Sequence, residues 1–252
     1  MNTHKIRMAA FVLAAGLSGT AQAALHDRGG GLIYDDVLNV TWQQEANLSR
    51  TQSFGVSYIS SQAGTMTWYN AQTWLAAMNA ANYLGYSDWR FPTVKPINGV
   101  AFNDQFSTNG TTDVGFNITS VNSEMAHLAN VDLIGMSQTC SPDSPVAPPN
   151  CSQVNIGLFK NIQLVYAYIS GADVYPGSDD YRAFVFNSPV SVNSVSFNYG
   201  YQGIAGKGYG AVAMVLRDGD VAAVPEPETY AMLLAGLGLV GAIVRRRKQA
   251  GI

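Results

Sequence analysis

The chain has 252 residues, of which 14 are Lys or Arg and 17 are Asp or Glu, so its formal net charge is -3. Without its two ends, the body of about residues 24–224 keeps 8 basic and 15 acidic residues, a charge near -7. This acidity excludes non-specific binding of nucleic acid as the function of the body, because the phosphates of DNA or RNA would repel it. An apolar fraction of 47% with only 12% charged residues excludes a disordered polymer and predicts one folded domain.

The N-terminus has the order of a secretory signal. Two basic residues are followed by an apolar stretch of mainly Ala and Leu. Ala21 and Ala23 then supply the small side chains that signal peptidase accommodates. We expect cleavage before Ala24, which removes residues 1–23 and exports the rest of the chain.

The body alternates short apolar runs with turn residues. In chain order we expect strands over residues 31–34 and 40–43, a helix over 68–84, a second helix from 123 to 128, and strands over 164–169, 183–186, 192–197 and 211–216. Thr67 is a suitable N-cap for the first helix, and Gly85 can end it in a left-handed conformation. Helices lie early and strands late, which predicts an α+β domain with antiparallel pairing over residues 24–223.

The two cysteines, Cys140 and Cys151, both lie in the exported body. They flank a loop rich in Ser, Pro, Asp and Asn. Export leads to an oxidising compartment, and a metal site would need more ligands at closer spacing. We therefore expect a structural disulfide between them.

The C-terminus carries three features in sequence. The motif Val224, Pro225, Glu226 and Pro227 comes first, an apolar run over 229–244 comes second, and a basic cluster with Arg245, Arg246 and Arg247 comes third. As a helix, that run would span roughly 24 Å, which predicts a transmembrane helix with its basic end in the cytoplasm. The prolines keep Glu226 extended on the outer side.

This three-part ending, residues 224–248, resembles the PEP-CTERM sorting signal of exopolysaccharide-producing Gram-negative bacteria. The resemblance implies recognition by an exosortase, a membrane-embedded cysteine peptidase that removes the tail. It further implies a precursor that is transiently in the inner membrane and a product at the cell surface or in the extracellular matrix. A permanent single-span anchor stays open as the alternative.

The body is similar to the Lcl C-terminal-like family, named after the C-terminal domain of a collagen-like bacterial adhesin. The likeness is carried by Gly-Tyr-Ser-Asp-Trp-Arg-Phe-Pro-Thr at 85–93, Gly-Leu-Ile-Tyr-Asp at 31–35, Val-Thr-Trp at 40–42, and the later stretches 181–186 and 214–221. It implies a C-type-lectin-like fold of two helices, short antiparallel strands and long loops.

Two groups of residues in the body could form sites. Asp88, Trp89 and Arg90 could form a ligand platform, with an indole face for a sugar and charges for its hydroxyls, or a structural corner. Acidic loops could hold Ca²⁺ or be solvated turns, and they contain Asp179, Asp180, Asp218 and Asp220. Apart from Ca²⁺, we expect no cofactor.

Motifs for catalysis are absent from the sequence. There is no Gly-x-Ser-x-Gly, His-Glu-x-x-His or phosphate-binding glycine loop, and the mature body keeps only His26 and His127. We therefore expect a non-catalytic module that binds glycan or matrix in a biofilm. The alternatives are a secreted hydrolase that uses paired carboxylates and a purely structural matrix protein.

The disulfide can be tested by peptide mass mapping of the exported protein without reduction. We expect one peptide pair linked through Cys140 and Cys151. The link should add roughly 3 kcal/mol to the free energy of unfolding, because it restricts the unfolded chain. Two free thiols, or a bridge between two molecules, would contradict the pairing.

Overall fold

The computed structural model describes residues 25–134, 136, 138–144, 152–186, 191–192, 195–196 and 200–221. The predicted signal peptide with its cleavage site, Cys151 and the whole C-terminal tail lie outside these residues. Cys140 lies in a described strand, whereas Cys151 lies outside the described residues. The pairing of the two cysteines therefore stays a prediction. The described residues contain no helix that is long and apolar enough to cross a membrane.

The first sheet joins the two ends of the described chain. Its strands are β1 (Leu25–Gly29), β2 (Leu32–Asp35), β3 (Val40–Gln43) and β14 (Leu216–Asp218), in that order and all antiparallel. The predicted hairpin of β2 and β3 is confirmed. Its turn is fixed by Asp35, whose carboxylate accepts hydrogen bonds from the N–H groups of Val37 and Leu38, and by Asn39, which has a left-handed backbone.

The remaining strands form three further sheets. The largest has the order β4 (Phe106–Ser107), β5 (Val114–Phe116), β13 (Tyr201–Gly206), β10 (Asp180–Val185) and β9 (Tyr168–Asp173). The third has the order β6 (Gln138–Cys140), β7 (Gln153–Ile156) and β8 (Phe159–Gln163). A two-stranded hairpin consists of β11 (Ser191–Val192) and β12 (Val195–Ser196). All pairs are antiparallel except β4 with β5.

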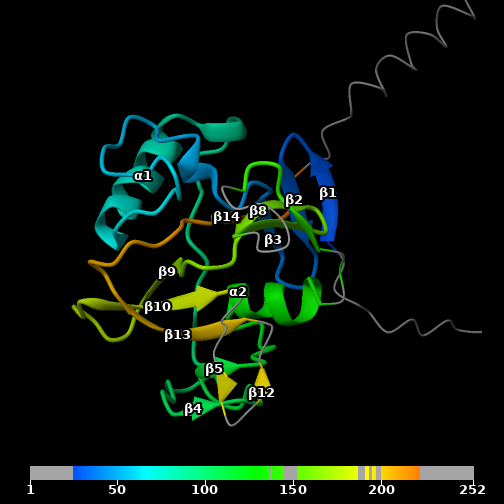
Figure 1. Ribbon diagram of the computed structural model, residues 1–252, viewed down its shortest axis with the longest axis vertical. Helices are drawn as coiled ribbons and strands as arrows, with labels where there is room; N and C mark the ends of the chain where they lie inside the picture. The colour runs from blue at the N-terminus through cyan, green and yellow to red at the C-terminus, as the bar shows by residue number, and fades with distance from the viewer. Residues whose placement is uncertain are drawn as a thin grey trace, which may run out of the picture.

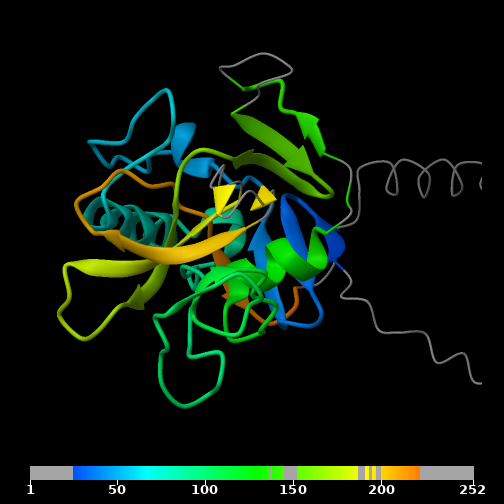
Figure 2. The same ribbon diagram turned by 60° about the horizontal axis from the view of Figure 1, so that its bottom comes forward.

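The described residues contain one long helix, α1 (Trp68–Ala80). Thr67 caps it as predicted, because its side chain accepts a hydrogen bond from the N–H of Asn70. The helix ends at Ala80, earlier than expected, and a separate 3₁₀ turn over Tyr83–Gly85 follows. α1 lies on the opposite side of the molecule from β1 and β2 (Figures 1 and 2).

The expected α+β, C-type-lectin-like fold with two helices is wrong. The described chain is mostly β-sheet, and the predicted second helix is a single turn, α2 (Glu124–His127), continued by a wider π-helical turn over Leu128–Asp132. The late strands are also displaced. Where we expected one strand over 164–169, β8 ends at Gln163 and β9 begins at Tyr168. Where we expected a strand over 211–216, the residues before Leu216 pair only through isolated bridges at Ala211 and Val212.

The apolar core has two clusters. One surrounds Trp42, and the other packs Trp74 of α1 against Trp89 and Tyr181 of β10. A carboxyl group is buried beside the first cluster, at Asp132, and neither of its oxygens has a hydrogen-bond donor among the described residues. Burial, and then the nearby charges of Asp35 and Asp36, raise the pKa of Asp132 to about 8. The imidazole Nε2 of His127 is 3.9 Å away, too far for a hydrogen bond.

We predict that Asp132→Asn removes a pH-dependent destabilisation. The folded state keeps the Asp132 proton up to about pH 8, whereas the unfolded state releases it near an ordinary pKa of 3.8. Stability therefore falls as pH rises between these values. The variant should be more stable than the wild type at pH 8 by about 1–3 kcal/mol, measured by urea unfolding at pH 5 and pH 8.

Asp113→Asn is the matched control, because Asp113 is equally buried but accepts hydrogen bonds from the N–H groups of Ile97 and Asn103. This variant should lose stability at both pH values. A loss of stability at pH 8 in Asp132→Asn would contradict the assignment.

Candidate functional site

The segment Asp88–Trp89–Arg90 connects α1 to the first sheet. Trp89 is 2% exposed, and its indole N–H donates to the carbonyl of Tyr83. The side chain of Asn79 binds both the N–H and the carbonyl of Trp89. The indole face therefore lies in the core and is not offered to a ligand.

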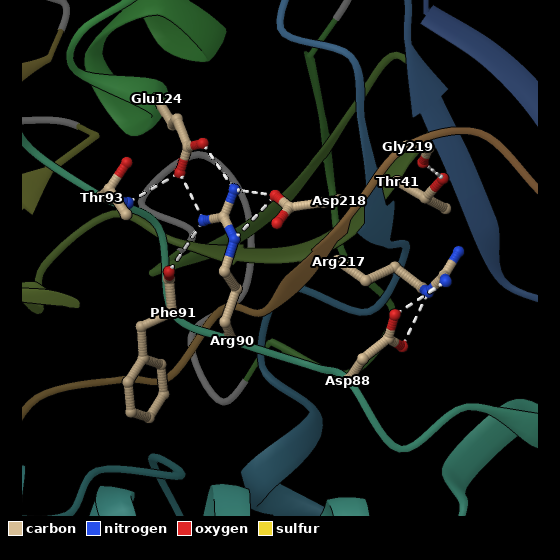
Figure 3. Close-up of polar contacts among 9 residues, drawn as sticks. All are labelled: Thr41, Asp88, Arg90, Phe91, Thr93, Glu124, Arg217, Asp218 and Gly219. Carbon is tan, nitrogen blue, oxygen red and sulfur yellow. Dashed lines mark hydrogen bonds and ion pairs between the residues drawn. The ribbon is translucent and has the colours of Figure 1, made fainter.

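Arg90 uses all five of its N–H donors inside the protein (Figure 3). Nη1 and Nη2 each donate to a carboxylate oxygen of Glu124 at 2.8 Å. Nε and Nη2 donate to Oδ1 of Asp218 at 2.9 and 2.6 Å, and Nη1 also donates to the carbonyl of Phe91 at 3.1 Å. Glu124 accepts a further hydrogen bond from the N–H of Thr93 at 2.6 Å.

The electrostatics match this geometry. Burial lowers the pKa of Arg90, but the hydrogen bonds to Glu124 and Asp218 outweigh it and raise the pKa. Arg90 is therefore a permanent cation that is neutralised by protein carboxylates. No donor of Arg90 is left over for a sugar hydroxyl.

Asp88 is paired on the outer side of the same corner. Its two carboxylate oxygens accept from Nε and Nη2 of Arg217 at 2.9 and 2.8 Å, and these hydrogen bonds lower the pKa of Asp88 (Figure 3). Arg217 also lies over the ring of Tyr86, 4.3 Å from its centre. The geometry of all three predicted residues thus favours the structural corner over the ligand platform.

Three of the four carboxylates in the predicted Ca²⁺ loops, all except that of Asp180, have a partner within the protein. Asp218 binds Arg90, and Asp220 forms a bidentate pair with Arg28 at 2.8 and 2.6 Å. Asp179 accepts from the hydroxyl of Tyr69 at 3.3 Å. Within the described ranges, no group of three or more His, Cys, Asp or Glu residues could hold a metal ion.

A cleft that sequence reasoning missed lies elsewhere, beside β7 and β8. It consists of two adjoining cavities of about 280 and 720 Å³ that share Arg50 and Ser61 in their walls. We call the two together the polar cleft. Its size lies in the range of small-molecule sites, and most of its lining residues carry a hydroxyl, an amide or a charged group.

The smaller cavity has a network of polar side chains. Asn161 donates to Glu45 at 2.8 Å and to Asp143 at 3.2 Å, while Arg50 donates to the backbone carbonyl of Asp143. Burial raises the pKa of Glu45. Both amide atoms of the neighbouring Gln153 are buried without a hydrogen-bond partner.

No local motif could have indicated the polar cleft, because its walls come from residues 45–65 and 143–166. A backbone bridge between Glu45 and Lys160 brings these segments together. The one signal in the sequence is a concentration of hydroxyl and amide side chains at residues 60–62 and 152–153.

Comparisons with known proteins gave two family matches. A family model described as the Lcl C-terminal domain matches residues 31–207, and the PEP-CTERM protein-sorting motif matches residues 223–248. Neither is a catalytic family. No curated protein and no solved structure matched the chain.

We predict that Glu124→Gln destabilises the fold far more than Asp218→Asn. Glu124 is 10% exposed and holds both Arg90 and a backbone N–H, so its loss should cost about 2–4 kcal/mol. The Asp218 side chain is 79% exposed, and its loss should cost less than about 1 kcal/mol. Denaturant unfolding measures both, and equal losses would show that the two ion pairs do not differ as described.

Proposed function

The chain belongs to the Lcl C-terminal domain family, and we propose on that basis that it is a surface or extracellular-matrix protein of a Gram-negative bacterium with a non-catalytic, glycan-binding body. Its PEP-CTERM motif makes it an exported substrate of exosortase, with a membrane-anchored precursor that is processed to the surface. The proposed role is adhesion within exopolysaccharide or biofilm. Signal peptidase acts first, before Ala24, and exosortase acts second.

One observation supports binding as the task of the body, namely the polar cleft. Its two cavities have the size of a small-molecule site, and hydroxyl, amide and charged side chains are among their lining residues. The corner at Asp88–Arg90 serves the scaffold in this proposal, since its charges are already paired. The net acidity of the body argues for a glycan that is not polyanionic.

A second candidate function, a carboxylate-dependent glycan hydrolase, is favoured by a specific pair. Glu45 and Asp143 accept hydrogen bonds from the same amide of Asn161 in the smaller cavity, and burial raises the pKa of Glu45. A general acid needs such a raised pKa. Release of reducing ends from exopolysaccharide, abolished by Glu45→Gln, would establish this activity, and a purely structural matrix protein would neither bind nor cleave.

The sorting of the protein is tested by Glu226→Ala together with Pro227→Ala. Neither residue lies in the apolar run 229–244, so insertion of the precursor should persist. Processing should stop, because the extended recognition peptide is lost. Full-length precursor should then accumulate in the inner membrane, as seen by fractionation with antibodies to the body and to a tag after Ile252.

Glu228→Ala is the matched control, since it removes an adjacent carboxylate outside the Val-Pro-Glu-Pro stretch at 224–227 and should be processed normally. If the double variant still releases tag-free body at the wild-type rate, the tail is not a sorting signal. A plain anchor cut by general proteolysis would then explain the product better.

A further inference from the structure

We infer that Asn109 is a site of spontaneous deamidation, at which the exposed pair Asn109–Gly110 converts slowly and irreversibly to aspartate and isoaspartate. Asparagine is followed by glycine at one other place in the chain, Asn98–Gly99, and there the fold protects the pair. The two pairs differ in the hydrogen bonding of the glycine N–H group, which is the group that must react.

The reaction needs only the two residues and water. The backbone nitrogen of Gly110 loses its proton and attacks Cγ of Asn109, which closes a five-membered cyclic imide and expels the side-chain nitrogen as ammonia. Water then adds to one of the two imide carbonyls and opens the ring. One opening leaves aspartate, and the other leaves isoaspartate, in which the main chain continues through Cγ. Glycine favours the attack, because it has no Cβ to hinder the closing ring.

The two pairs share the features that bring the reacting atoms together. Both asparagines are exposed, so water reaches them. Oδ1 of Asn98 accepts hydrogen bonds from the N–H groups of Val100 and Ala101 at 2.9 and 3.1 Å. Oδ1 of Asn109 accepts from the N–H and the hydroxyl of Thr111 at 3.3 and 2.7 Å. Such a turn holds the side-chain carbonyl beside the peptide unit of the glycine, and the donors polarise Cγ.

The glycine nitrogens distinguish the two pairs. The N–H of Gly99 donates to the carbonyl of Pro96 at 2.9 Å, so this hydrogen bond must break before the nitrogen can attack. The N–H of Gly110 has no acceptor among the residues that the structure describes. One net hydrogen bond of this kind changes an equilibrium by about threefold to tenfold, so Asn109 should react faster than Asn98 by about that factor.

The fold requires glycine at position 110. Gly110 has a φ of +74°, and a Cβ there would overlap the carbonyl oxygen of Asn117. A larger residue would therefore strain the loop, and the reactive pair is retained for a structural reason. The side chain of Asn117 also donates to the carbonyl of Thr108 at 2.8 Å, which closes the loop around Asn109 and Gly110.

Deamidation at this place acts on the edge of the five-stranded sheet. The loop that contains Asn109 joins β4, the edge strand, to β5, and Phe106 of β4 packs on Phe116 of β5 with ring centres 6.1 Å apart. Aspartate keeps an oxygen acceptor for Thr111 and should leave the loop in place. Isoaspartate adds one atom to the main chain of a tightly closed loop, so β4 should detach from β5.

The experiment incubates the full chain, purified in detergent, at pH 8 for several weeks and follows both asparagines by peptide mass spectrometry. We expect deamidation at Asn109 to be about threefold to tenfold faster than at Asn98, with isoaspartate among the products. Equal rates in the folded protein, or a faster reaction at Asn98, would overturn the inference.

The same incubation in guanidinium chloride is the control for the fold. Unfolding breaks the hydrogen bond between Gly99 and Pro96, so both pairs should then react at similar rates. If the difference between Asn109 and Asn98 persisted in the unfolded chain, the neighbouring sequence rather than the hydrogen bond would set it, and the inference would fail.

Asn109→Gln is the matched variant for the effect on the sheet. Glutamine keeps an amide at this exposed position but closes a larger ring far more slowly, so deamidation there should stop while the protein stays folded. Amide hydrogen exchange in β4 and β5 should become faster in aged wild type and not in aged Asn109→Gln.

Asn109→Asp carries only the aspartate product and should keep the slow exchange of fresh wild type. Fast exchange in this variant would overturn isoaspartate as the cause, because the added charge alone would then loosen β4. Unchanged exchange in an aged sample that contains isoaspartate would overturn the effect on the strand.

Discussion

The pairing of Arg90 with the C-terminal strand is the constraint on which the rest of the structure depends. Its backbone N–H donates to the carbonyl of Leu216 at 2.8 Å, and the N–H of Leu216 returns a bond at 3.0 Å. The guanidinium of Arg90 then joins Asp218 of the same strand to Glu124 of α2 (Figure 3). Three segments that are remote in sequence thus meet at one side chain. Because all five donors are satisfied, the partly buried charge fixes one arrangement.

Two consequences follow for the architecture. β14 is held between Arg90 and β3, so the ends of the described chain close into one sheet. Trp89, adjacent to Arg90, is drawn into the cluster that packs α1 against β10. None of the residues of this corner lines the polar cleft, whose walls come from β7, β8 and the loops beside them.

Sequence patterns correctly predicted those features that depend on interactions between residues close together in the chain. The β2–β3 hairpin and the Thr67 cap were predictable, because turn and cap residues act over a few positions. The second helix was not, since the helical pattern at 123–128 carries no sign that the chain widens into a π-helical turn at Leu128. The apolar run 211–215 pairs only by single bridges, at Ala211 with Met66 and at Val212 with Tyr168 of β9, before the chain enters β14, and its composition does not reveal this.

The candidate sites, too, could be predicted from the sequence only in part. The segment around Asp88–Arg90 was distinctive in sequence, and in the structure its charges are paired with other residues of the protein. The sequence did not indicate the polar cleft, because Glu45 and Gln153 are remote in sequence and come together through the bridge between Glu45 and Lys160 of β8. A family resemblance identified the sorting tail and the body correctly, but the fold expected from it, with two helices, was wrong.

Amide hydrogen exchange at Arg90 and Leu216 tests the central claim most directly. If this pairing holds the scaffold together, both amides should exchange only through global unfolding, as slowly as those at the centres of β10 and β13. Glu124→Gln should then accelerate exchange at both positions and at the strand centres together. Fast exchange at Arg90 and Leu216 while β10 and β13 stay protected would contradict the account, because the corner would then open without loss of the fold.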